Sequence, residues 1–297
     1  MIFFSVIIPT YNRASLIGET IRSVLDQSYT GFEVIIVDDG SADHTRQVIE
    51  TYFKDDSRIR YFYKTNEERG AARNFGMKKA QGDYAVFFDS DDWMQPHYLE
   101  TLQQVIAANP GIFLVAAKYD YRNNGSTEVH PLLHPLAEGW YERSFFLEGN
   151  ILACNYCIRL KETNPYPFPE ERELASMEDW LFLLQNLGNQ KIFIRDEVCV
   201  TMRQHEHRSM NDNQKVIEAR KKATAWALKN LSLTPVESNN LQAWSYYFCG
   251  IHQYLDNNRV AALNETWHAI KTGGIKKEFL ALLTKSLAGR KLIQAIR

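Results

Sequence analysis

Short apolar runs alternate with longer segments of helical spacing over residues 1–120, and this alternation constrains the fold more than any other feature. The apolar runs are rich in β-branched and aromatic residues, as strands are. We expect strands at residues 5–9, 32–37, 58–63, 84–88 and 112–117. We expect helices at residues 16–27, 44–53, 70–80 and 96–109. Alternation of this kind predicts an α/β fold in which helices flank a mostly parallel sheet.

The rest of the chain divides into a loop-rich stretch and a helical end. Residues 119–169 include prolines at positions 131, 135, 165, 167 and 169, which indicates loops. A helix at 177–187 and strands at 191–194 and 198–202 are expected to follow. From about residue 211 the pattern is helical. The sequence Thr-Pro-Val-Glu at 234–237 predicts a capped helix start, and residues 246–255 and 260–271 predict an antiparallel helix pair.

Composition limits the class of partner. The chain has 297 residues, of which 45% are hydrophobic, so it can bury an ordinary globular core. Its net charge of −2 provides no general basic field. We therefore expect no nucleic acid partner and favour a small-molecule substrate.

Cysteine usage and the apolar segments favour the cytoplasm. Four scattered cysteines do not suggest a disulfide framework. Cys154 and Cys157 have the spacing of a metal or redox pair, but no second pair accompanies them, so ordinary buried thiols are the favoured interpretation. The apolar start lacks basic residues and stops at Pro9, unlike a signal peptide. No run of about 18 apolar residues predicts a transmembrane helix.

Polar residues follow three of the predicted strands directly. These exits read TYNR at residues 10–13, DDGS at 38–41 and DSDD at 89–92. In an open parallel sheet, ligands bind beyond the carboxyl ends of the strands, so five carboxylates are expected to share one rim. Like charges at close range need a cation or hydrogen-bond donors. Carboxylates suit Mg²⁺ or Mn²⁺, which often bridge to phosphates, and this predicts a phosphorylated ligand.

The absence of three known motifs excludes several classes of phosphorylated ligand. Two of the polar loops also have simpler structural explanations. No G-x-G-x-x-G turn follows the first strand, and no G-x-x-x-x-G-K-[ST] loop or EF-hand spacing is present. Residues 38–41 alone could form a strand-to-helix turn, with Ser41 or Asp43 capping the next helix. Residues 89–92 alone could be a solvated acidic loop.

Five motifs strongly resemble those of the inverting family 2 glycosyltransferases, which have the GT-A fold. They are SVIIPTYN at residues 5–12, VDDGS at 37–41, RGAARNFG at 69–76, FDSDD at 88–92 and MEDW at 177–180. Their order and spacing also match, and the resemblance covers residues 3–210. It implies a GT-A catalytic domain over residues 1–210, divided into a nucleotide-binding half (1–120) and an acceptor-binding and catalytic half (120–210). Residues 211–297 would be a helical C-terminal extension.

The resemblance implies a donor site on the strand exits and on the helix near residue 70. The nucleotide-binding residues that it implies are Thr10, Tyr11, Asp38, Asp39, Arg73, Asn74 and Asp89. In the D-x-D motif Asp89 faces the ribose, and Asp91 coordinates the Mn²⁺ or Mg²⁺ ion that bridges the diphosphate. Without the resemblance, residues 69–76 could be a helix whose arginines are merely solvated.

Two further assignments come from the resemblance. Asp179 is implied as the base that takes a proton from the acceptor hydroxyl. The alternative is a helix cap, because SMED at 176–179 matches the pattern S-x-x-[DE]. Residues 202–209 are similar to the family's arginine and histidine segment, where a histidine joins the metal or the diphosphate. His205 or His207 could take that role; we choose His205, and Arg203 beside it favours a phosphate site.

Together these features predict an inverting enzyme that moves a sugar from a nucleotide-diphosphate donor, in particular a UDP-sugar. The expected acceptor is a glycan or lipid-linked glycan in cell-surface polysaccharide synthesis. A metal-dependent phosphohydrolase and a non-catalytic nucleotide-sugar binding protein remain as alternatives. Residues 271–297 carry seven Lys or Arg and one Glu among apolar residues, which could allow peripheral contact with the inner face of a membrane. A helix packed on the body with a solvated basic face is the favoured alternative.

Overall fold

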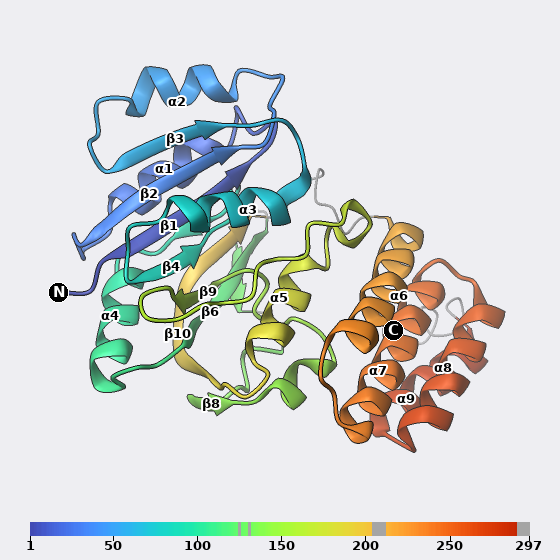
Figure 1. Ribbon diagram of the computed structural model, residues 1–297. Helices are drawn as coiled ribbons and strands as arrows, with labels where there is room; N and C mark the ends of the chain where they lie inside the picture. Colours follow the sequence, from blue (N-terminus) through green and yellow to red (C-terminus); the bar gives the residue numbers. More distant parts are fainter. Residues whose placement is uncertain (124–125, 130–131, 204–211, 290–297) are drawn as a thin grey trace. The chain divides into compact units, whose positions relative to one another are not determined.

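The computed structural model describes residues 1–123, 126–129, 132–203 and 212–289, which form two compact units (Figure 1). The sheet unit comprises the described residues of Met1–Glu142, Ile151–Arg172 and Asn189–His205. The helical unit comprises those of Arg143–Asn150, Glu173–Gly188 and Glu206–Arg297. The two units therefore do not follow a single boundary near residue 210, because two segments that precede it belong with the C-terminal helices.

The sheet unit has a mixed sheet with the strand order β3-β2-β1-β4-β9-β6-β10-β5. Its strands are β1 (Phe4–Thr10), β2 (Phe32–Asp38), β3 (Ile59–Tyr63), β4 (Tyr84–Phe87), β5 (Trp93–Met94), β6 (Leu114–Asn123), β9 (Tyr156–Arg159) and β10 (Ile192–Arg203). Two further strands pair outside this path, β7 (Ser126–Val129) with β6 and β8 (Gly139–Tyr141) with β10. The first four strands run parallel, as do β6 and β10. The predicted α/β fold with a mostly parallel central sheet is confirmed.

Four α-helices connect strands in the part of this unit that the structure describes. They are α1 (Ile17–Leu25), α2 (Thr45–Phe53), α3 (Glu68–Lys79) and α4 (Tyr98–Ala108). Right-handed crossovers place α1 and α2 on one face of the sheet and α3 on the other, because the chain reverses direction across the sheet after β3. Helix α3 approaches β1 closely at Gly76, where an added Cβ would lie 2.4 Å from Cγ2 of Ile7.

Two features of the sheet differ from the sequence prediction. The stretch 119–169, predicted to be loops, contains the end of β6 together with β7, β8 and β9, and β9 inserts antiparallel between β4 and β6. The two strands predicted at 191–194 and 198–202 are one strand, β10, whose register against β6 shifts between Arg195 and Val200. A β-bulge interrupts the side-chain alternation, so one bulged strand reads in the sequence as two short strands.

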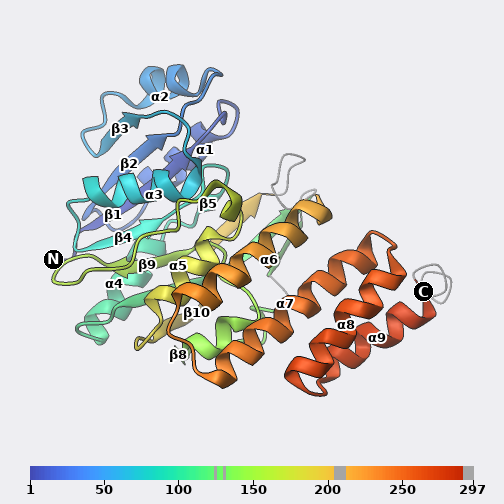
Figure 2. The same cartoon turned by 45° about the vertical axis from the view of Figure 1, so that its right-hand side comes forward.

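In its described residues the helical unit contains the short 3₁₀ segments η1 (Arg143–Leu147) and η2 (Arg172–Leu174, at its border) and five α-helices. The helices are α5 (Glu178–Asn186), α6 (Asn213–Asn230), α7 (Pro235–Leu255), α8 (Arg259–Gly273) and α9 (Lys277–Ala288). Helix α7 begins with the predicted capping box between Thr234 and Glu237. Helices α7 and α8 lie side by side after a short connection, as expected for an antiparallel pair (Figure 2).

Helix α9 covers part of the basic C-terminal segment and packs against other helices. Its Phe279 is fully buried and packs with Ala243, Trp244 and Ala269. Helix α9 therefore packs within the helical unit, which supports the alternative of a packed helix over residues 277–288, while membrane contact stays a prediction. None of the helices in the described residues has the length and apolar character that a membrane crossing requires. All four cysteines are buried and free, and this agrees with the interpretation of Cys154 and Cys157 as ordinary thiols.

Candidate functional site

The carboxyl ends of β2, β1 and β4 adjoin in the sheet unit. Thr10 at the end of β1 pairs in register with Asp38 at the end of β2, and the backbone N–H of Asp39 donates to the carbonyl oxygen of Thr10 at 2.8 Å. β4 is the other parallel neighbour of β1. The strand order 3-2-1-4 thus creates a topological switch point, which is where open α/β sheets bind ligands.

Asp38 and Asp39 are buried and hydrogen-bonded within this rim. Asp38 accepts from the backbone N–H of Ser41 and from the Tyr61 hydroxyl, each at 2.8 Å. Asp39 accepts from Nζ of Lys64 at 2.8 Å and from the backbone N–H of Glu67. Burial and the bond to Asp38 raise the pKa of Tyr61, so its hydroxyl remains a donor. Hydrogen-bond donors of the chain therefore compensate the negative charge of these two carboxylates, whereas the sequence analysis favoured a metal ion for this purpose.

The loop after β1 is tied to the loop after β2. The backbone N–H of Asn12 donates to the Ser41 hydroxyl at 2.9 Å, and the Asn12 side-chain oxygen accepts from the N–H of Ala42 at 2.8 Å. His44, without a side-chain cap bond, is the N-cap residue of α2. The Asp43 carboxylate, one residue earlier, accepts from the backbone N–H of Thr45, the first residue of α2, at 2.9 Å. The alternative in which Asp43 caps α2 is therefore confirmed, whereas Ser41 joins the two exit loops.

Arg73 and Asn74 lie on α3 and are almost fully buried. Nη2 of Arg73 pairs with Oδ1 of Asp89 at 2.8 Å, and its guanidinium lies over the ring of Phe168. The Asn74 side chain bonds the backbone N–H and C=O of Phe168 and the Glu170 carboxylate, each at 2.8 Å. Arg73 is therefore not solvated, because it forms an ion pair with Asp89. Asn74 fixes the segment at 168–170 through its hydrogen bonds.

The acidic loop after β4 could hold a divalent cation. It turns between Asp89 and Asp92, whose backbone N–H donates to the carbonyl oxygen of Asp89 at 3.3 Å. Carboxylate oxygens of Asp89, Asp91 and Asp92 all lie within 4.8 Å of one another. Oδ2 of Asp91 also pairs with Nη2 of Arg13 at 3.4 Å. Three clustered carboxylates provide the hard oxygen ligands that Mg²⁺ and Mn²⁺ prefer, so the residues fit such an ion.

Arg203, at the end of β10, joins the acidic loop to helix α1. Its backbone N–H donates to Asp92 at 3.2 Å, and its Nε donates to the carbonyl oxygen of Asp91. Nη1 pairs with Glu19 at 2.8 Å, and the guanidinium lies over the Trp93 ring at 4.7 Å. Burial lowers the pKa of Arg203, although the surrounding carboxylates act in the opposite direction. The phosphate role expected for Arg203 stays a prediction; the described contacts show that it braces the acidic loop.

Asp179 belongs to the helical unit, in the first turn of α5. Asn150 donates to its Oδ2 at 2.9 Å, and the backbone N–H of Trp180 donates to its Oδ1 at 2.8 Å. The N-cap residue of α5 is Met177, which makes no side-chain cap bond, and Ser176 has a left-handed φ of 79°. The capping alternative built on Ser176 is therefore wrong, and the role of Asp179 as a base stays a prediction.

Several partners of the predicted residues were missed from the sequence, and one prediction falls outside the described residues. Tyr61, Lys64 and Asn150 contact the predicted aspartates, yet none stands in a recognisable motif. The alternation in β3 could have indicated that Tyr61 and Tyr63 share a face, but not that Asp38 is the partner of Tyr61. His205 lies outside the residues that the structure describes.

Comparison with known sequences gives a consistent result. The sequence model of the family described as Glycosyl transferase family 2 matches residues 5–163. A Bacillus subtilis protein named as a candidate teichuronic acid biosynthesis glycosyltransferase, TuaG, is 33% identical over 183 residues, which cover 61% of this chain and 71% of that protein. A second B. subtilis relative, the candidate glycosyltransferase EpsH, is 28% identical over 60% of this chain. The chain spans only 54% of that relative's length.

Comparison with solved structures supports the fold. The first 349 residues of S. aureus TarS, solved in complex with UDP-GlcNAc, match with a TM-score of 0.69 and 24% identity over 98% of this chain and 88% of that one. A Pyrobaculum calidifontis mannosyltransferase, solved with GDP-Man and Mn²⁺, matches with a TM-score of 0.62 and 18% identity over 98% of this chain and 82% of that one. At these identities the likeness shows a shared fold.

Proposed function

The chain belongs to glycosyl transferase family 2, and on that premise we propose that it transfers a sugar from a UDP-linked donor to a cell-surface glycan. The observation that carries the proposal is the acidic cluster of Asp89, Asp91 and Asp92 at the topological switch point of the sheet. The UDP-GlcNAc complex of the TarS structure supports a UDP-sugar donor. The teichuronic acid assignment of the B. subtilis relative supports a glycan or lipid-linked glycan acceptor.

The nucleotide end of the donor is proposed to bind at the ends of β1 and β2. Tyr11 is half exposed beyond β1, where its ring can stack on a nucleobase. Within the described residues the buried Thr10 hydroxyl has no hydrogen-bond partner, so it can bond the donor. Asp38 and Asp39 are already oriented by Tyr61 and Lys64. Carboxylates held in this way can accept hydrogen bonds from ribose hydroxyls without first having to be ordered.

The diphosphate end is proposed to bind at the acidic loop. Asp91, with Asp89 and Asp92, would hold Mn²⁺ or Mg²⁺, which when bound offsets the charge that develops on the departing nucleotide. Arg73 keeps Asp89 in place through its 2.8 Å ion pair. Arg13, which pairs with Asp91, brings a second cationic group to the same place and can contact a phosphate oxygen.

Asp179 is proposed as the general base that takes the proton from the acceptor hydroxyl. Its two oxygens accept from Asn150 and from the Trp180 N–H, and these bonds hold the carboxylate in one orientation. Direct displacement with this base would invert the configuration at the anomeric carbon.

Two carboxylate-to-amide variants test the assignment. The purified full chain is incubated with a panel of UDP-sugars, Mn²⁺ and envelope glycan acceptors, and UDP release and donor binding are measured. Asp91→Asn should lose metal-dependent donor binding and turnover together. Asp179→Asn should keep its local structure, because an amide oxygen can still accept from Asn150, and it should still bind the donor. Its turnover should fall about 10²- to 10⁴-fold. Asp55→Asn, on an exposed turn, is the matched control and should keep full activity.

The outcomes also separate the alternative functions. Undiminished turnover in either site variant contradicts the assignment of that residue. Donor binding without any UDP release by the unmodified protein would indicate a non-catalytic binding protein. Release of inorganic phosphate would indicate a phosphohydrolase. The anomeric configuration of the product, read by NMR, tests inversion directly.

A further inference from the structure

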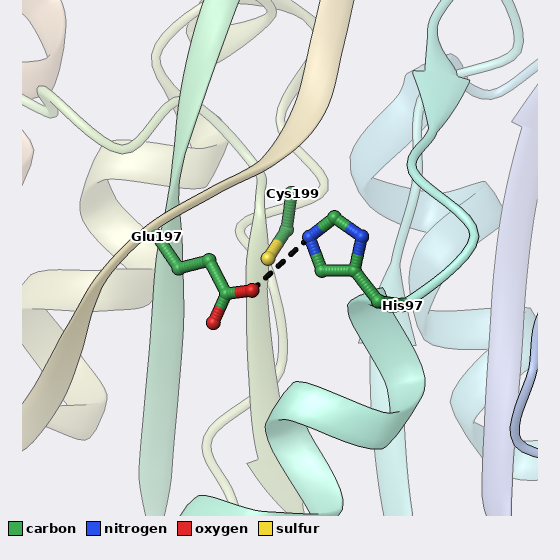
Figure 3. Close-up of side chains that lie close together, drawn as sticks. All are labelled: His97, Glu197 and Cys199. Carbon is green, nitrogen blue, oxygen red and sulfur yellow. Dashed lines mark ion pairs between the residues drawn. The ribbon is translucent and has the colours of Figure 1, made fainter.

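A second cluster of metal-ligating side chains lies apart from the acidic loop. His97 directly precedes α4, and Glu197 and Cys199 lie on β10 (Figure 3). One nitrogen, one carboxylate oxygen and one sulfur from these residues all lie within 4.8 Å of one another. The imidazole Nε2 is 3.2 Å from Oε1 of Glu197. Cys199 is buried beneath this pair, and Figure 3 shows its sulfur directed toward both partners.

The cluster includes a stretch of β10 that is irregular. Against β6, Arg195 pairs with Ala117, Val198 with Lys118 and Val200 with Tyr119, so β10 carries extra residues at 196–197 and at 199. Bulges of this kind re-aim side chains. Glu197 and Cys199 both lie in this bulged stretch, two residues apart, and their side chains reach the same point.

The surroundings hold Glu197 in a ligating orientation. Its Oε2 lies 3.5 Å from Nε of Arg195 and accepts from the Thr101 hydroxyl at 3.4 Å, while Oε1 is directed at His97. Hydrogen bonds to the second oxygen of a carboxylate commonly orient the first oxygen toward a metal ion. The backbone is held as well, because the N–H of Gln95 donates to the carbonyl oxygen of Cys199 at 2.8 Å.

We propose that His97, Glu197 and Cys199 form a binding site for a transition-metal dication of the zinc type. Imidazole, thiolate and carboxylate are all zinc ligands, and three protein ligands leave a fourth position for water. The thiolate selects against Mg²⁺ and Mn²⁺, the ions suited to Asp89, Asp91 and Asp92. Binding involves no redox step: the Cys199 thiol releases its proton to solvent and the sulfur coordinates the cation.

A cation at this site would clamp the start of α4 to β10. Between the acidic loop and α4 lies β5, whose Met94 pairs with Val200 on β10. The clamp would therefore secure the short strand that directly follows Asp92. This function is separate from donor binding and does not depend on the proposed glycosyl transfer.

Cobalt provides a direct test, because a cobalt–thiolate bond gives a near-ultraviolet charge-transfer band that oxygen ligands do not. The full chain is freed of metal with a chelator and titrated with Co²⁺. The band should appear, persist in Cys249→Ser, which removes a buried cysteine of the helical unit, and vanish in Cys199→Ser. His97→Gln, at a half-buried position, should weaken Co²⁺ binding at least 10-fold without affecting folding. Added Zn²⁺ should displace the cobalt and abolish the band.

Three results would overturn the proposal. They are the absence of a band in the unmodified chain, a band that survives Cys199→Ser, and unchanged Co²⁺ affinity in His97→Gln. Circular dichroism of each variant verifies folding. Should Cys199→Ser fail to fold, the His97→Gln titration decides by itself. In that case no loss of affinity means that the three residues are only an ion pair above a buried thiol.

Discussion

Replacing Gly40 by alanine should destabilise the sheet unit and disturb the donor site together. Gly40 follows Asp39 and has a left-handed φ of 85°, which costs an L-residue about 1–2 kcal/mol. An added Cβ would also lie 2.9 Å from the backbone nitrogen of Asn66. Forcing extra volume against backbone typically costs about 1–3 kcal/mol. The free energy of unfolding should therefore fall by about 2–5 kcal/mol in Gly40→Ala.

A matched control separates the two contributions. Gly111 has a φ of 84°, but the nearest atom to its added Cβ is the end of the Arg159 side chain at 3.6 Å. Gly111→Ala should therefore lose only the backbone cost of about 1–2 kcal/mol. Both glycines belong to the sheet unit, so the same unfolding transition reports both.

Urea unfolding followed by circular dichroism measures the two losses, and UDP-sugar titration measures donor affinity. Affinity should fall in Gly40→Ala alone, because Asn66 and Glu67 bond Asp39 beside the clash. Equal destabilisation of the two variants would refute the steric part of the reasoning. A Gly40→Ala protein as stable as the unmodified chain would refute all of it.

Two further predictions concern helix packing and pH. Gly76→Ala should destabilise the sheet unit by about 1–3 kcal/mol, because the added Cβ would lie 2.4 Å from Ile7. Gly18→Ala on α1 meets only an ordinary van der Waals contact, so it should raise the free energy of unfolding by up to about 1 kcal/mol. Thermal unfolding of the two variants checks that the two changes have opposite signs. Hydrogen bonds from Arg58 lower the pKa of Asp56, so this pair stabilises the fold above about pH 4 and loses its effect as the pH falls further. Asp56→Asn should cost under about 1 kcal/mol at pH 7 and less at pH 3, and the opposite trend in urea midpoints would contradict this.

Local patterns in the sequence were sufficient for the first four βα units and for the start of α7. The segments at residues 35–37 and 86–88 are continuous apolar runs, and burial on both faces of the sheet explains them. The capping box at Thr234 and Glu237 involves neighbours three residues apart, so the sequence contains all of its determinants. The polar residues at the strand exits could be placed at one edge of the sheet, because strands and helices alternate in the sequence and the crossovers between parallel strands are right-handed.

Where the structure departs from the prediction, the determinants lie far apart in the chain. β9 has four residues, too few for a clear pattern, and it exists as a strand because β4 and β6 pair with it on either side. The capping interpretation of Ser176 failed for a similar reason: the segment before α5 packs in the helical unit with a left-handed Ser176, and no local rule indicates that conformation.

The sequence by itself determined the α/β class, the family and the positions of the acidic loops, because each depends on short-range periodicity or on contiguous motifs. Only the tertiary structure decided which donors compensate which carboxylates. Asp92 and Arg203 are 111 residues apart, and Tyr61 reaches Asp38 from another strand. Such pairs arise from strand order and register, in which a shift of one residue moves a side chain to the other face of the sheet. The same holds for His97, Glu197 and Cys199, which share no motif and come together from the start of α4 and from β10.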